Sequence, residues 1–514
     1  MSVGGAHMTS NGMGAILTVV LVSSMAVFGQ DDTSGQGMAD RAVAETNDKL
    51  SGLEESYLET KATVDKLKKF KLSGHIQAQV RYAIDTAGNA NYRIGDYAGG
   101  AFAENTKGVV QVRRGRFKLA YDNTITQAVI QLDCIPKGVS IKDAYLQFTD
   151  PWIKTVSVKG GVFDRPFGFE ISYSSSSRES PERSRLFQTL FPGERDLGFQ
   201  LGLQAPENLP PAAQAFNFKG GWFAGNGISD ETDRNLDFIG RLGFAIPITS
   251  ANMSIDGGIS GYYGKVTCTD TTVSSRTVAK VDTSKWTVKT TYAYDSTLGY
   301  TVPRDSAVRV RDTTWTVTGR GYSYEIDKEL KRFKKSPGDD LNRDFVRQYI
   351  GGDLQFTYDI PCLGGLQLRG EVIGGAQPGT KGSSGFYNTG RGSNQPVYDR
   401  NFLGWYAMWV QNWGSRIQSV LKYDSYDPNM DIAGKDIDSA GVKSGGLSTA
   451  DLRYNTLGAG LVYHWDENLK FVLYYDHVMN ETMSDDVLKL KDKNAFYTKD
   501  LKDDVITFRI QYKF

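Results

Sequence analysis

Segments in which apolar and polar side chains alternate, each about ten residues long, run through most of this chain. The last is the clearest, because every second residue from Ile506 to Phe514 is apolar while Thr507, Arg509 and Gln511 lie between them. Such alternation predicts β-strands with one buried face, since successive side chains of a strand point to opposite faces. From residue 71 to the end no long helical periodicity interrupts the pattern. The sequence therefore predicts an all-β fold.

The connections between these segments alternate in length. We count sixteen strands, near residues 72, 109, 125, 140, 155, 197, 214, 237, 252, 346, 364, 401, 415, 452, 468 and 504. Every second link is short and the interleaved links are long, with Ile135–Val139 as the one exception. All long loops then lie at one end of the sheet, which is typical of transmembrane barrels with short periplasmic turns. A soluble sandwich also alternates, but it has no reason to separate its loops by length.

Composition agrees with a barrel and excludes other classes. The 59 Lys plus Arg equal the 59 Asp plus Glu, so a nucleic-acid-binding protein is not expected. The mean hydropathy of -0.38 and the lack of long apolar runs after the N-terminus exclude a helical membrane protein. Barrels of sixteen to eighteen strands enclose an aqueous channel, whereas eight-stranded barrels are filled by side chains. The expected fold, a sixteen-stranded antiparallel transmembrane barrel, is therefore that of a pore.

The N-terminal part divides into two expected segments. Residues 1–29 read as a signal peptide, with an apolar core from Ala15 to Phe28 and cleavage before Gln30, although no Lys or Arg precedes the core. A buried helix of the mature protein is the alternative. Residues 30–70 then form a periplasmic linker with a helix over Asn47–Lys69. Its apolar residues at a and d spacing predict a coiled coil: Leu50, Leu53, Tyr57, Val64 and Leu67. A lone amphipathic helix lying on its own barrel is the other possibility.

The barrel itself is expected over 71–514, with 265–345 as a long extracellular insertion. Strand-like runs at Lys285–Tyr294 and Ala307–Val317 predict an external hairpin within that insertion. Cys134 then lies at the external end of the barrel and Cys362 in a periplasmic turn, so the two cannot form a disulfide. The insertion also supports a second function class, in which the barrel is an anchor, an adhesin or a subunit of a surface complex.

The sequence offers no recognisable catalytic or metal-binding motif. Three scattered cysteines are too few for a disulfide framework or a zinc cluster. The acidic loop Asp427–Asp431 begins like a calcium loop but has Ile432 where such a loop needs Gly. We therefore expect no cofactor, no metal and no enzymatic activity, with a barrel-embedded Ser/His enzyme as the remaining alternative.

At several points the chain resembles the phosphate-selective porin O and P family, in its Bacteroidetes-type members. The resembling segments are Val112–Phe117, Gly161–Gly168, Glu182–Ser184, Phe191–Gly198, Tyr423–Asn429 and the terminal strand ending in Phe514. The resemblance implies a usually trimeric channel of the bacterial outer membrane, with an N-terminal periplasmic helix and a periplasmic C-terminus. It also implies outer-membrane lipid, the barrel assembly machinery, small anionic or polar solutes and further copies of the chain as partners.

Phosphate-specific members carry a ladder of arginines and lysines in the pore, and an uninterrupted ladder does not align onto this chain. The candidate pore-lining and anion-contacting residues are Arg113, Arg114, Arg116, Lys118, Arg165, Arg178, Arg183, Arg185, Arg195, Arg241 and Arg369.

Charge counting leads to a modest predicted preference for anions. On the expected inward faces of strands two to sixteen, eleven cations stand against eight acids. The connection 164–196 adds five arginines and six acids, so it contributes no net positive charge. Its Arg178, Arg183 and Arg185 are spaced to face the lumen if the connection folds inward, where a narrow passage focuses their field. The alternative is a solvated external loop whose arginines are ion-paired.

Overall fold

The computed structural model describes residues 33–84, 102, 106–206, 209–210, 214–231, 235–267, 271–276, 294–295, 300–301, 315–319, 323–335, 344–385 and 396–514. The chain divides into two compact units, Met1–Lys69 and Phe70–Phe514. The first contains helix α2 (Thr33–Lys68), which begins earlier than the predicted Asn47 and is solvent-exposed from Arg41 onward. None of the helices in these residues is both long and apolar enough to cross a membrane.

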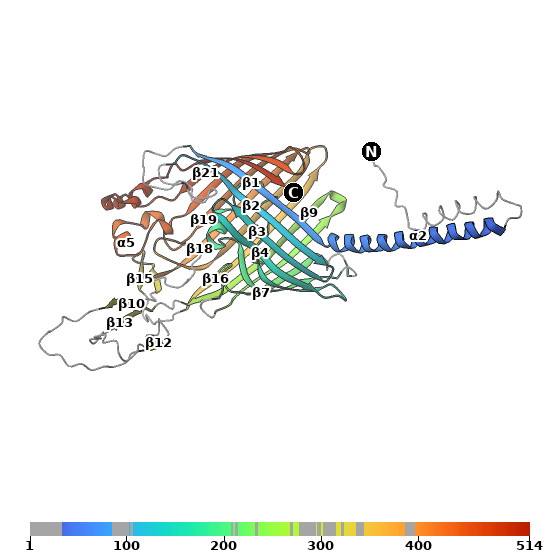
Figure 1. The fold of residues 1–514 in the computed structure, drawn as a ribbon. Helices are drawn as coiled ribbons and strands as arrows, with labels where there is room; N and C mark the ends of the chain where they lie inside the picture. The colour runs from blue at the N-terminus through green and yellow to red at the C-terminus, as the bar shows by residue number, and fades with distance from the viewer. Residues whose placement is uncertain are drawn as a thin grey trace. The chain divides into compact units, whose positions relative to one another are not determined.

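The second unit is a closed barrel of sixteen antiparallel strands (Figure 1). In chain order they are β1 (Phe70–Ala83), β2 (Gly108–Asn123), β3 (Thr126–Ile135), β4 (Gly138–Thr149), β5 (Val156–Asp164), β6 (Arg195–Gln204), β7 (Phe216–Phe223), β8 (Asp237–Ile248), β9 (Met253–Thr267), β16 (Asp344–Ile360), β17 (Gly364–Gly379), β18 (Val397–Trp413), β19 (Ile417–Asp427), β20 (Tyr454–His464), β21 (Leu469–Asn480) and β22 (Val505–Lys513). Each strand pairs with its neighbours in this order, and β1 pairs with β22 to close the ring. The predicted fold and all sixteen strand positions are confirmed.

Loop lengths separate between the two barrel ends as predicted. The short-turn end includes the connections 124–125, 249–252, 361–363 and 414–416, while the long-loop end includes 165–194, 428–453 and 481–504. The exception is also present, because only Pro136 and Lys137 separate β3 from β4. Cys134 and Cys362 are both free and exposed, the first near the long-loop end and the second in a short turn. Cys268 lies outside the described residues.

The alternating pattern places polar side chains inside the barrel and apolar side chains outside. On β22, Thr507, Arg509 and Gln511 are buried, whereas Phe508 and Ile510 are each 41% exposed. The same outward exposure recurs around the barrel, for example at Leu242, Ile259, Leu354, Trp405 and Leu473. A closed barrel with an apolar exterior and a polar interior spans a bilayer. This chain is a transmembrane barrel of the bacterial outer membrane.

The described residues of the 265–345 insertion contain paired strands, while most of the two runs predicted to form a hairpin lies outside those residues. β10 (Thr271–Arg276) pairs with β13 (Trp315–Gly319), and β14 (Ser323–Asp327) pairs with β15 (Arg332–Lys335). Of the predicted run Ala307–Val317, only Trp315–Val317 is described, and these residues belong to β13. Of the run Lys285–Tyr294, only Tyr294 is described, in the short pair β11 (Tyr294–Asp295) and β12 (Tyr300–Thr301). The predicted pairing of these two runs therefore stays a prediction.

Long loops pack together at their end of the barrel around a second hydrophobic core. This cluster, called the cap below, has the buried residues Phe333, Tyr398, Ile432, Ile437, Val442, Leu447, Leu452, Met483 and Val487. They come from the β14–β15 hairpin, the start of β18 and the connections 428–453 and 481–504. The cap also contains a buried ion pair, in which Arg400 donates to Asp451 at 2.8 Å. These loops therefore form an ordered structure with its own core.

Candidate functional site

The connection between β5 and β6, residues 165–194, folds into the barrel interior and is called the constriction segment below. Most of its side chains are buried, and its backbone accepts hydrogen bonds from inward-facing residues of distant strands. Gln77 on β1 donates to the carbonyl oxygen of Ser175 at 2.9 Å, and Lys470 on β21 donates to that of Ser176 at 2.8 Å. In the described structure, therefore, the segment is not a solvated external loop.

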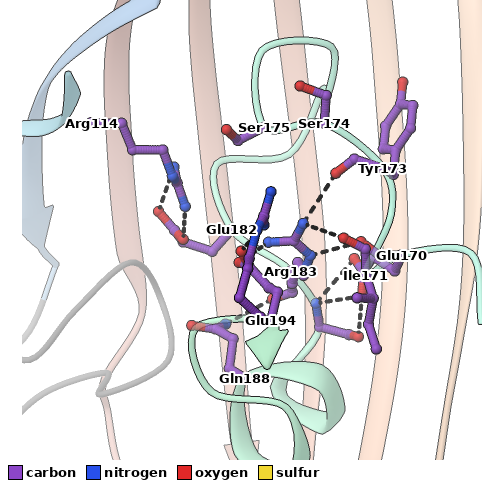
Figure 2. A network of polar contacts seen from close by, with 12 residues as sticks. Arg114, Glu170, Ile171, Tyr173, Ser174, Ser175, Glu182, Arg183, Gln188 and Glu194 are labelled. Atoms are coloured by element: carbon purple, nitrogen blue, oxygen red, sulfur yellow. Dashed lines mark hydrogen bonds and ion pairs between the residues drawn. The ribbon is translucent and has the colours of Figure 1, made fainter. Parts of the chain in front are cut away.

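Glu182 of this segment contacts three arginines of the barrel wall. Its carboxylate accepts from Arg114 Nη2 at 2.7 Å (Figure 2). It also accepts from Arg113 Nε at 2.9 Å and from Arg509 Nη2 at 3.0 Å. Burial alone would raise the pKa of Glu182, but Arg113 first, and then Arg114 and Arg509, hold it well below the usual value. Three guanidinium groups from two strands, β2 and β22, thus meet on one ionised carboxylate.

A second set of contacts attaches the start of the segment to the opposite wall. Glu371 on β17 accepts hydrogen bonds from the backbone N–H groups of Phe169 and Glu170, at 2.7 and 2.8 Å. The Glu170 carboxylate accepts from Lys422 Nζ on β19 at 2.7 Å and from the Ser184 hydroxyl at 2.6 Å. Because charged groups take part, these bonds are stronger than neutral ones. The segment is consequently attached to both sides of the lumen.

Arg183 holds the segment in its folded form from within. Its guanidinium donates to the carbonyl oxygens of Glu170 at 2.7 Å, Ile171 at 3.0 Å and Tyr173 at 3.1 Å, and it also pairs with Glu194 (Figure 2). Arg183 and Arg195 together keep the pKa of Glu194 below its usual value despite burial. One side chain therefore satisfies three carbonyl groups that have no partner in a strand or helix.

An apolar contact completes the attachment. The short helix α3 (Arg185–Leu190) buries Leu186, Phe187 and Leu190, and Phe191 follows it. These side chains belong to one cluster with inward-facing aromatic residues of β9, β16 and β18, namely Tyr262, Tyr349, Phe402 and Tyr406. The centroids of the Phe191 and Tyr349 rings are 5.8 Å apart in an edge-on arrangement. Part of the lumen is therefore occupied by a hydrophobic core.

A small cavity remains between the segment and the wall. It has a volume of about 30 Å³, which holds roughly two or three water molecules. Its charged lining residues are the cations Arg183, Arg185 and Lys422 and the acids Glu182, Asp424 and Asp476. Equal numbers of opposite charges give this cavity no net preference for anions.

The structure brings most of the candidate arginines into ion pairs. Arg113 and Arg114 contact Glu182, and Arg116 lies 3.7 Å from Asp133. The remaining pairs are Arg165 with Asp196, Arg183 with Glu194, Arg195 with Asp143 and Glu194, Arg241 with Asp353 and Arg369 with Glu179. Arg185 lies over the ring of Tyr454, its Cζ 3.8 Å from the centroid, and Lys118 is half-buried on β2. Arg178 is treated below.

Sequence reasoning omitted several charged residues that face the lumen, above all Arg81, Arg347 and Arg400. Arg347 donates to Asp237 at 2.9 Å across β9, and both side chains are 1% exposed. The alternating pattern could have identified Arg347. It lies two residues before Tyr349 and six before Asp353, so all three side chains share one face of β16. In the described part of the chain, no group of three or more His, Cys, Asp or Glu side chains could hold a metal ion.

Comparison with known proteins finds no matching family model and no matching curated protein. Solved structures with a similar fold include the outer membrane channel DcaP of Acinetobacter baumannii, at 10% identity and a TM-score of 0.45 over 87% of this chain and 97% of that one. OprB of Pseudomonas putida matches at 9% identity and 0.45 over 88% and 96%. The anion-selective porin from Comamonas acidovorans matches at 10% and 0.40 over 87% and 99%. Structural similarity this weak does not identify a function for this chain.

Proposed function

We propose that this chain is a non-enzymatic outer-membrane porin through which small hydrophilic solutes diffuse passively, with a modest preference for anions such as phosphate. The observation that carries the proposal is a closed sixteen-stranded barrel whose inward faces are polar and charged. The anion preference rests on the excess of inward cations over acids, to which Arg81 and Arg347 add, whereas Arg400 is balanced by Asp451. The resemblance to the phosphate-selective porin O and P family agrees with it. Arg114, Arg116 and the arginines of the constriction segment are the proposed anion contacts.

Reversal potential across a salt gradient in a planar bilayer tests this proposal. The wild-type channel should favour the anion, and replacing both Arg114 and Arg116 with Glu should shift the reversal potential toward cation preference. Arg416→Glu, in an exposed turn at the short-turn end, is the matched control and should change little. Cation preference of the wild type, or no shift in the double variant, would contradict the proposed selectivity.

We further propose a homotrimer in which α2 forms a periplasmic coiled coil. In support, the apolar residues of its heptads are exposed in the single chain: Leu53 is 68%, Tyr57 65% and Leu67 62% exposed. Residues at a and d positions are buried when parallel helices associate. Outer-membrane lipid and the barrel assembly machinery are the other partners that this fold requires.

The cap favours a second candidate function, that of an anchor, adhesin or surface-complex subunit. Long loops with their own core present a fixed surface, which a diffusion channel does not need. Single-channel recordings bear on this choice, because a diffusion channel must conduct whereas an anchor need not.

A further inference from the structure

The constriction segment contacts the barrel wall on almost every side. Besides β1, β17, β19 and β21, it reaches β9, where the backbone N–H of Gly168 donates to Ser260 Oγ at 2.9 Å. Wall residues at this level are as buried as a protein core: Gln77 is 0%, Arg114 3%, Lys422 4% and Arg509 3% exposed. Polar side chains that line open water would be exposed, so the segment fills the cross-section at this level.

We propose that the constriction segment is a gate that closes this lumen, and that Glu182 holds it shut while Arg178 opposes closure. The proposal rests on the proposed channel function and adds a regulated opening to it. Opening means that the part of the segment around residues 174–183 leaves the wall of β1, β2, β21 and β22. The anchors on β17 and the apolar contacts of α3 then keep the segment tethered inside the barrel.

Glu182 suits the holding role because of the charges that it brings together. Arg113, Arg114 and Arg509 would repel one another without the carboxylate between them. Charge-assisted hydrogen bonds to one acid are strong, and they are lost together when that acid leaves or is neutralised. The segment supplies this carboxylate and the wall supplies the cations, so the interaction exists only in the closed arrangement.

Arg178 has the opposite effect on the closed state. Its side chain is 4% exposed, and none of its three guanidinium nitrogens has a hydrogen-bond partner within the described residues. Burial, together with Arg183 and Arg114, lowers its pKa well below the usual value, despite the opposing effect of Glu182. An unpaired buried cation is costly and would regain hydration if the segment moved into open water. Glu182 thus favours the closed state and Arg178, four residues earlier, opposes it, as expected for an element with two states.

Single-channel recording of the full-length protein in planar bilayers tests the gate. Glu182→Gln should raise the open probability about tenfold or more, because a neutral amide cannot compensate three guanidinium groups. Arg178→Met should lower it, because the closed state then buries no unpaired charge. Asp256→Asn and Lys219→Met remove lumen charges that have no described contact with the segment, and they should leave the open probability unchanged.

A cross-link keeps the test decisive if a charge variant fails to fold. Gln77→Cys with Ser175→Cys, with Cys134, Cys268 and Cys362 replaced by Ser, should conduct less when the two thiols are bridged and recover on reduction. A wild type that is open throughout, with Glu182→Gln indistinguishable from it, would overturn the gate and leave the channel function intact. Absence of conductance from every variant, including the reduced pair, would refute the gate and the proposed channel together.

Discussion

The buried ion pair in the cap leads to a quantitative prediction. Asp451 is 0% exposed and accepts hydrogen bonds from Arg400 Nε at 2.8 Å, Asn429 Nδ2 at 2.9 Å and the backbone N–H of Ser448 at 2.9 Å. Asp451→Asn keeps the shape of the side chain but leaves the Arg400 guanidinium, itself 2% exposed, without a compensating charge. Removing one partner of a buried pair typically costs about 3–5 kcal/mol.

The cost should appear as local opening of the cap, because the pair joins the connection 428–453 to the first residues of β18. At a factor of ten for each 1.4 kcal/mol, the opening equilibrium of residues 428–453 should rise by about 100-fold or more. Hydrogen exchange measured by mass spectrometry in detergent micelles reports this equilibrium directly. Peptides from β19 and β20 should exchange as in the wild type.

Two further variants complete the test. Asp485→Asn removes an exposed carboxylate of the same cap and should change local stability by no more than about 0.5 kcal/mol. Adding Arg400→Met to Asp451→Asn removes the uncompensated charge, so the double variant should recover part of the protection. If Asp451→Asn exchanges no faster than Asp485→Asn, the pair does not stabilise the cap and the reasoning is wrong.

Four other outcomes follow from the structure. Leu53→Asp should convert the trimer in mild detergent to smaller species, as measured by light scattering, because it places a charge in the coiled-coil seam; a monomeric wild type would exclude the trimer itself. Burial raises the pKa of Asp503 to about 7, so its folded form retains a proton that the unfolded form loses near pH 4. Local stability of the 481–504 connection should therefore fall as pH rises from about 4 to about 7, and Asp503→Asn should abolish that dependence in exchange measurements. Trypsin added to whole cells should cleave after Lys334, whose side chain is 58% exposed, and protection would show that the β14–β15 hairpin is covered. Mass spectrometry should find no disulfide between Cys134 and Cys362, and finding one would contradict the strand register.

The strands could be predicted because each carries its own signal. On β22 the alternation from Ile506 to Phe514 specifies both the strand and its two faces, since one face meets lipid and the other meets polar contacts. Helix α2 shows the opposite case at its N-terminus. Residues 33–46 have no heptad pattern, but extending an existing helix costs little compared with starting one. The helix therefore begins at Thr33, before the first residues of the heptad pattern.

The site could be predicted only in part, because its geometry depends on residues distant in sequence. Spacing indicated that Arg178 and Arg183 could face the lumen, and both lie in the segment that folds inside. Nothing local, however, connects Glu182 with Arg509, since β22 becomes a neighbour of β2 only across β1 in the closed ring. The single-residue register of these strands decides which arginines meet the carboxylate. This register is set by the pairing of all the strands around the ring, so no single segment of the sequence specifies it.

Closure of the barrel through β1 and β22 also limits how this molecule can be made. Its two terminal strands pair over His75–Ala83 and Val505–Lys513, so the ring cannot be completed until the last residues of the chain have been delivered. Every partial sheet before that moment has two unpaired edges, which invite aggregation with other chains. Pairing the two ends of a long chain is also intrinsically slow. During biogenesis, hundreds of residues must therefore be kept from associating with other chains until the C-terminal strand is available. A chain truncated before Val505 could not close the ring, so its unpaired edges would make it prone to aggregate in the cell.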